Sequence, residues 1–154
     1  MDGDRLRLGG PFCNWTLETE GLLFDQVADT SEALWQEHRL CVRLDCNNIE
    51  FQVVSNRQRW NWRAFPKSKR YGLVAKTGSA AAARSEAVVG GADDGHNHNF
   101  QIKESPPKVV IISVWLQGAT MKDGLSLDAL LRQKGVKARV TYSREGLDPQ
   151  VALL

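Results

Sequence analysis

The sequence of 154 residues has no apolar run that approaches the ~18 residues of a membrane-spanning helix. Its first ten residues, MDGDRLRLGG, lack the apolar stretch of a secretory signal peptide. Cysteine is scarce, and three residues, an odd number, do not suggest a disulfide framework. We therefore expect a cytoplasmic protein that has no membrane partner.

Motifs of the common enzyme classes are missing as well. There is no P-loop, no GxGxxG after a strand, no GxSxG and no HExxH. The sequence therefore leans away from catalysis, and it predicts no cofactor. It also contains no internal repeat and no heptad pattern, and its length is that of one domain spanning 1–154.

The clearest structural pattern is the segment 108–116, KVVIISVWL, which is uncharged after its first residue. β-branched and aromatic side chains dominate this segment, as is typical of a strand. Both of its alternating sets of side chains are mostly apolar. We therefore expect a strand near the middle of a sheet, covered on both faces.

Two further patterns belong to the same sheet. Residues 40–54 alternate between apolar and polar side chains on either side of an Asn-Asn pair, which predicts a β-hairpin. Residues 125–134 carry leucines along one side, which predicts a helix, and residues 136–142 alternate as a strand. The order strand, helix, strand favours a right-handed crossover between parallel strands.

Two regions are less regular. The spacing of Asp29 and Glu32 is that of a capping box and favours a short helix at 31–38. Residues 77–100 are rich in Gly and other small residues, so we expect a mobile loop there. The alanines of this region leave a short helix at 80–88 as an alternative.

Together these patterns predict an α+β fold in a single domain. Its mixed β-sheet would contain the β-hairpin at 40–54, the central strand at 108–116 and a C-terminal β-α-β unit. One or two short helices would pack on the sheet. Residues 100–103 would add an edge strand beside the loop at 77–100.

The net charge is only +2, but it is unevenly distributed. Residues 1–37 hold eight acids and two bases, a net charge of −6, whereas residues 38–84 hold ten bases and two acids, a net charge of +8. This polarity fits a solvated surface, an anionic partner, or an acidic segment that folds back over the basic one.

Basic residues are concentrated in 57–71, RQRWNWRAFPKSKRY, which has six bases, no acids and four aromatics. Binding of single-stranded nucleic acid needs cations for phosphate and aromatic rings for unstacked bases. We therefore predict a small binding protein that engages RNA or single-stranded DNA. The candidate site comprises Arg57, Arg59, Trp60, Trp62, Arg63, Lys67, Lys69 and Arg70, and Lys137 and Arg139 would widen it if their strand faces the same side.

Three alternatives stay open. If 57–63 is extended, both tryptophans point to one side, so they would suit the core while the arginines stay solvated. The chain would otherwise be a protein-interaction or homo-oligomeric structural or regulatory module without a nucleic-acid ligand, using the apolar tail at 151–154 for subunit contacts. The third alternative is an enzyme with a cleft under the 77–100 loop.

A pair of histidines provides the candidate metal ligands. His96 and His98 have His-x-His spacing and follow Asp93 and Asp94, a combination that is able to ligate Zn, Ni or Fe. The same residue types also occur together in ordinary polar loops. The sequence therefore predicts no metal site, with these two histidines as the candidates if one exists.

Overall fold

The structure is a computed structural model of the chain, and it describes residues 3–11, 17, 22–28, 34–44, 48–67, 82–96, 98–103, 108–143 and 152–153. These residues form ten strands and one short helix. In chain order the elements are β1 (Leu6–Gly9), β2 (Asp25–Gln26), β3 (Gln36–Leu44), β4 (Asn48–Ser55), β5 (Arg59–Pro66), β6 (Ala82–Gly90), β7 (Phe100–Lys103), β8 (Lys108–Gln117), α1 (Leu127–Leu131), β9 (Lys137–Ser143) and β10 (Ala152–Leu153).

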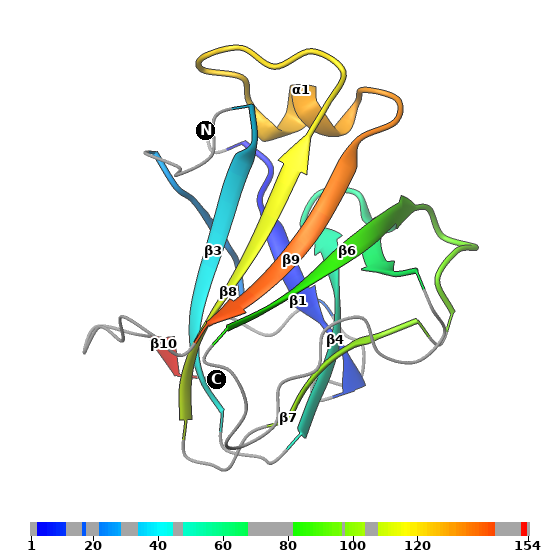
Figure 1. Cartoon of the computed structure of the whole chain (residues 1–154). Coiled ribbons are helices and arrows are strands. Elements are labelled where there is room, and N and C mark those ends of the chain that lie inside the picture. Colours follow the sequence, from blue (N-terminus) through cyan, green and yellow to red (C-terminus); the bar gives the residue numbers. More distant parts are fainter. Residues whose placement is uncertain are drawn as a thin grey trace.

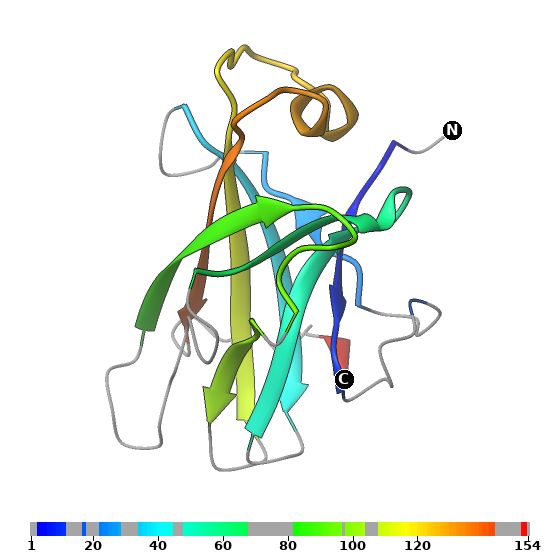
Figure 2. The ribbon, with the colours of Figure 1, turned by 90° about the vertical axis from the view of Figure 1, so that its right-hand side faces the viewer.

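The strands form one antiparallel wall in the order β1-β4-β5-β6-β9-β8-β3, to which only β10 adds a parallel pairing. β2 pairs with the other edge of β3. Residues just before β2 bind β1, because the amide of Leu8 donates to the Leu22 carbonyl (3.0 Å) and that of Phe24 to the Leu6 carbonyl (2.8 Å). The wall therefore curls into a nearly closed barrel (Figure 1, Figure 2).

Alternate side chains of the strands fill the barrel. Val110, Ile112 and Val114 of β8 point inward and are fully buried. On β4 and β7, the rings of Phe51 and Phe100 pack with their centroids 5.4 Å apart. Burial of each such large side chain stabilises the fold by about 1.5–3 kcal/mol.

The helix α1 closes one end of the barrel (Figure 1). The Ser126 side chain caps it by accepting a hydrogen bond from the amide of Ala129 (3.1 Å). Leu127, Leu130 and Leu131 are buried on its inner side. Within the described residues no helix is long and apolar enough to cross a bilayer.

The α+β prediction is wrong: the barrel is nearly all antiparallel strand, and α1 is the one helix in the described residues. The predicted parallel crossover is also replaced, because β9 runs antiparallel beside β8. Helix length explains this outcome. At 1.5 Å per residue α1 spans about 7.5 Å, whereas the ten residues of β8 span about 33 Å. So short a helix cannot carry the chain back along the sheet.

Within the described residues β3 and β4 do not pair with each other, so the hairpin predicted at 40–54 is wrong, although both of its strands exist. β3 pairs with β8 along its whole length, while β4 pairs with β1, β5 and β7. The alternating pattern correctly assigns one inward face to each strand. It carries no information about which strand supplies the hydrogen-bonding partner, and here that partner is distant in sequence.

Local predictions had mixed outcomes. Residues 36–38, expected to be helical, belong to β3, and residues 82–90, expected to be loop or helix, form β6 between β5 and β9. Pairing with β9 at 82–87 and with β5 at 87–90 overrides the helix preference of alanine there. The strands at 108–116 and 100–103 are confirmed as β8 and β7, and the helix within 125–134 is confirmed in the shorter form α1. Residues 31–33 of the predicted helix, and residues 77–81 and 97 of the predicted loop, lie outside the described residues.

Candidate functional site

The turn between β4 and β5 carries the first two bases of the predicted nucleic-acid site. Both side chains are exposed. Nη1 of Arg57 lies 3.2 Å from Oδ1 of Asp128, the acid in the first turn of α1. Arg59 begins β5 with a φ of 59°, a left-handed conformation that is uncommon outside glycine. The turn is therefore joined to the end of the barrel that α1 covers.

The middle of the segment points inward. Trp62 is 5% exposed and belongs to the core. Arg63 is also buried: its Nε donates to the Gly91 carbonyl (2.9 Å) and its Nη2 donates to the Ala92 carbonyl. Its guanidinium carbon also lies 5.5 Å from the ring centroid of Trp60. Trp62 and Arg63 therefore contribute to the interior and to the support of the loop after β6.

The last bases of the segment lie at the far end of β5. Lys67 is exposed directly after this strand, while Lys69 and Arg70 lie outside the described residues. The eight residues of β5 span about 26 Å, so Lys67 is separated by that length from the turn that holds Arg57. The structure thus joins Trp60 to Arg63 but does not gather the described bases on one surface. Of the apolar tail at 151–154, residues 151 and 154 lie outside the described residues, while Ala152 and Leu153 form β10, which pairs with β3.

The two candidate metal ligands follow β6. His96 is exposed. The ring of His98 packs edge-on against Phe65, with centroids 5.7 Å apart, and its Nδ1 lies 3.0 Å from the Pro66 carbonyl oxygen. A carbonyl oxygen only accepts, so Nδ1 is the donor of this hydrogen bond. In the described part of the chain, no three His, Cys, Asp or Glu side chains form a group that would hold a metal ion.

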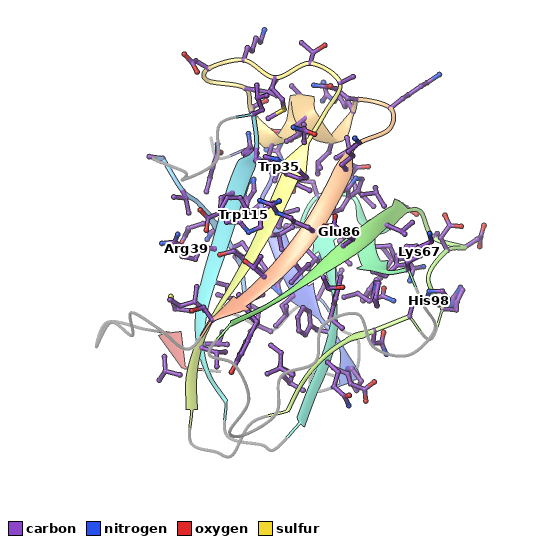
Figure 3. All side chains as sticks on the ribbon, viewed as in Figure 1. Trp35, Arg39, Lys67, Glu86, His98 and Trp115 are labelled. Carbon is purple, nitrogen blue, oxygen red and sulfur yellow. The ribbon has the colours of Figure 1, made fainter. Side chains whose placement is uncertain are left out.

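A different surface is built by the outer faces of β3, β8, β9 and β6, which lie side by side (Figure 1, Figure 3). The strand register places one outward residue of each strand in a row, in the order Glu37, Trp115, Arg139 and Glu86. Trp35, just before β3, covers this row. The guanidinium carbon of Arg139 is 4.4 Å from the ring centroid of Trp35 and 5.1 Å from that of Trp115.

Hydrogen bonds hold this outer face in place. Glu37 is only 2% exposed and accepts hydrogen bonds from Oγ of Ser113 (2.9 Å) and Nη2 of Arg39 (2.9 Å). Nε1 of Trp115 donates to Oγ1 of Thr141 (3.0 Å). The side chains are therefore ordered before any ligand arrives, which reduces the entropy that binding would cost.

The sheet opens where β6 and β9 diverge. β6 pairs with β9 only up to Ala87, and its last residues pair with β5 alone. The opening, which we name the β6–β9 hollow, has a volume of about 560 Å³. Its apolar lining includes Trp35, Val88, Val89 and Val136, and its polar lining is Glu86, Gln117 and Lys137.

A second hollow of about 480 Å³ adjoins the first at Gln117. Nε2 of Gln117 donates to the carbonyl of Leu34 (3.2 Å), which lines this second hollow. Leu34 has a φ of 71°, and its side chain is 68% exposed. Contacts among the described residues therefore do not account for an apolar side chain at this strained position.

The sequence offered little indication of this face. Trp35, Trp115 and Arg139 come from distant parts of the chain, and only the barrel brings them together. The one local signal was the outward set of the 108–116 strand, where a serine and a tryptophan interrupt an otherwise aliphatic run. Neither residue suggests a site without its neighbours on β3 and β9.

Comparison with known proteins leaves the function to be argued from this geometry, because no protein-family model, curated protein or solved structure matches the chain. The fold defines the class as an antiparallel β-barrel with an ordered outer face. Such barrels serve many functions, so the fold alone does not indicate one.

Proposed function

We propose that the protein is a small binding module without catalytic activity, which binds a segment of another polypeptide on the outer face of β3, β8, β9 and β6. The observation that supports this function best is the β6–β9 hollow, which combines an apolar lining with an interruption of the sheet. Natural sheets usually cover or blunt such interrupted edges. Polypeptides commonly bind at them by adding a strand.

Exposed apolar side chains support the same function. Among the described residues the large hydrophobic side chains that are exposed are Leu34, at 68%, and Val88, at 38%. Each lines one of the two adjoining hollows. Apolar groups gathered around a depression, with charged residues at its edge, are typical of interaction sites.

Selection of a phage-displayed random peptide library on the immobilised protein tests this function. We expect enriched peptides whose affinity, measured by fluorescence anisotropy, falls by about tenfold or more in Val88→Arg, since a charged side chain would occupy the edge of the hollow. Gln58→Arg adds the same charge at the exposed β4–β5 turn and should leave the affinity unchanged. Thermal melts confirm that both variants fold. Absence of enrichment, or an equal loss in both variants, would overturn the proposal.

Single-stranded nucleic acid is the second candidate ligand, and the placement of cations favours it. Lys137 is exposed on the outer face, and the side chain of Arg39 is 46% exposed on the neighbouring row. Both lie on the face that carries Trp35, whose ring is partly exposed, whereas Trp115 is 8% exposed. Cations beside aromatic rings are the combination that unstacked bases and phosphates require.

Anisotropy with labelled RNA and DNA oligonucleotides, at about 50 and 200 mM salt, tests this second candidate. Binding should weaken steeply with salt. If the outer face is the site, an Arg39→Ala/Lys137→Ala double variant loses affinity. If the segment 57–71 is the site, a Lys67→Ala/Lys69→Ala/Arg70→Ala triple variant loses it. Unchanged binding in both variants, or no salt dependence, would count against nucleic acid.

A further inference from the structure

We propose that the ligand of the outer face is a proline-rich segment in the polyproline II conformation, which crosses β8 and β9 and places two prolines, three residues apart, in the two adjoining hollows. This ligand rule rests on the polypeptide-binding function proposed above. Three features of the face lead to it: the distance between the hollows, the tryptophan between them, and the hydrogen-bond donors beside it.

The sheet directs such a ligand across its strands. The ladder between β6 and β9 is closed at the pair Ala87 and Ala138, so a further strand cannot insert between these two strands. The second hollow adjoins the β6–β9 hollow at Gln117 of β8. A segment that fills both hollows must therefore lie on the surface and run across β8 and β9.

The distance between the hollows matches the repeat of polyproline II. The second hollow lies beside Leu34 and Gln117, where the chain entering β3 adjoins the end of β8, and the β6–β9 hollow lies between β9 and β6. Neighbouring strands are about 4.8 Å apart, so these positions are separated by about 10 Å, two strand spacings. Polyproline II has three residues per turn and rises about 3.1 Å per residue, so residues i and i+3 lie about 9 Å apart on the same side.

Trp35 provides an aromatic platform between the hollows. Its ring reaches across β8 to cover Arg139 of β9, with 4.4 Å between the guanidinium carbon and the ring centroid, and it also lines the β6–β9 hollow (Figure 3). Trp35 is partly exposed, so the contact with Arg139 leaves part of the ring open to a ligand. Aromatic-lined grooves bind proline-rich segments, whose preformed conformation lowers the entropy that binding costs.

The polar residues along this path carry hydrogen-bond donors. Nε2 of Gln117 has two N–H groups, one of which donates to the Leu34 carbonyl (3.2 Å). Lys137 is exposed and pairs with Gln117 in the β8–β9 ladder, whereas Glu86 stands one row away, opposite Arg139. A polyproline II segment has no internal hydrogen bonds, and its prolines have no N–H, so it offers carbonyl acceptors and few donors. The cation and the amide on the path complement those acceptors.

The test uses the full chain and three fluorescein-labelled peptides. The first, Ala-Pro-Pro-Ala-Pro-Pro-Ala, has prolines three residues apart. In the second, Ala-Pro-Pro-Ala-Ala-Ala-Pro-Pro-Ala, no two prolines have that spacing, and in the third valine replaces every proline of the first. Anisotropy should show binding of the first peptide. The other two should bind about tenfold more weakly or worse, because the second cannot place prolines in both hollows and the third lacks the polyproline II conformation.

A substitution at Leu34 provides the matched comparison. Asparagine tolerates the positive φ of 71° at this position, so Leu34→Asn removes an apolar side chain from the second hollow without adding strain. Binding of the first peptide should weaken about tenfold in this variant and should be retained in Leu34→Met, which keeps an apolar side chain. Gln58→Asn, at the exposed β4–β5 turn, is the control and should bind as the parent does. Equal binding in Leu34→Asn and the parent, or equal binding of the first and second peptides, would overturn the ligand rule.

Failure of the ligand rule can be told apart from failure of the function. If the valine peptide, or library peptides without proline, bind in a Val88-dependent manner while the first peptide does not, the rule falls and the polypeptide-binding function stands. If no peptide binds at all, both fall. If light scattering shows dimers that Leu34→Asn dissociates, a second copy of the chain occupies the hollows, and the ligand rule is overturned.

Discussion

The guanidinium carbon of Arg139 lies 4.4 Å from the ring centroid of Trp35, so the start of β9 is joined to the residue that precedes β3 across the intervening strand β8. A cation over an indole ring contributes about 0.5–2 kcal/mol, depending on its desolvation. Arg139 is 6% exposed, which places this contact toward the stronger end of that range. Burial also lowers the pKa of Arg139 without removing its charge under ordinary conditions.

Replacement of Trp35 tests how much this contact stabilises the barrel. We expect Trp35→Ala to lower the free energy of unfolding by about 1–2 kcal/mol in urea denaturation, because it removes the ring that covers Arg139. Trp35→Phe keeps a smaller aromatic face and should recover part of the loss. Equal stability of the alanine variant and the parent would show that the contact contributes nothing.

The buried histidine of β3 predicts a dependence of stability on pH. His38 is 2% exposed, its Nε2 lies 2.7 Å from Oε1 of Gln36, and burial lowers its pKa from 6.5 to about 4. Between these two values the unfolded chain binds a proton that the folded chain does not. The contribution of His38 to stability is therefore complete above pH 6.5, and it falls by about 1.4 kcal/mol per pH unit on acidification toward pH 4.

Urea denaturation between pH 7.5 and 4 measures this slope. His38→Gln removes the titrating group and should flatten the slope in that window by about the amount given above, although it lowers stability at neutral pH, where His38 is uncharged. An identical slope in His38→Gln would mean that other groups cause the acid sensitivity.

A buried carboxylate joins the start of the chain to the β4–β5 turn. Asp4 is 9% exposed, and its Oδ1 accepts hydrogen bonds from the amides of Arg5 (2.8 Å) and Arg57 (2.9 Å), while its Oδ2 accepts from Oγ of Ser55. Asp4→Ala leaves these donors without an acceptor and should cost about 2–3 kcal/mol of unfolding free energy. Asp25→Ala, which removes only the exposed ion pair with Arg5, should cost less than about 1 kcal/mol. Similar losses in both variants would contradict this interpretation.

Alanine substitutions at two glycines with positive φ distinguish the cost of backbone strain from the cost of steric crowding. A Cβ at Gly95 would lie 2.5 Å from the ring of Phe65, whereas a Cβ at Gly124 would meet nothing within 4 Å. Their φ angles are nearly the same, 74° and 76°. Gly124→Ala should therefore cost about 1–2 kcal/mol from the backbone alone, and Gly95→Ala should cost about 1–3 kcal/mol more. Equal midpoints in thermal melts of the two variants would show that Phe65 moves aside freely.

The basic segment shows why the predicted site was only partly recoverable from the sequence. Density of charge and aromatic residues along the chain does not say which side chains a fold buries. Trp62 is in the core, as one alternative held, but Arg63 is also buried, because the Gly91 and Ala92 carbonyls accept its hydrogen bonds. A buried arginine needs such partners, and they become visible only when the loop after β6 is placed against β5.

The sequence by itself determined where several strands run and which of their side chains point inward, as in β8 and β9, because alternation is a local property of two neighbouring residues. The tertiary structure alone decided the partners: β3 beside β8, β4 beside β1 and β5, and β6 between β5 and β9. Backbone hydrogen bonds are chemically alike at every strand edge, so pairing is selected by the packing of the whole barrel. The same packing created the outer face and its hollow, whose residues become neighbours only after the wall has curled.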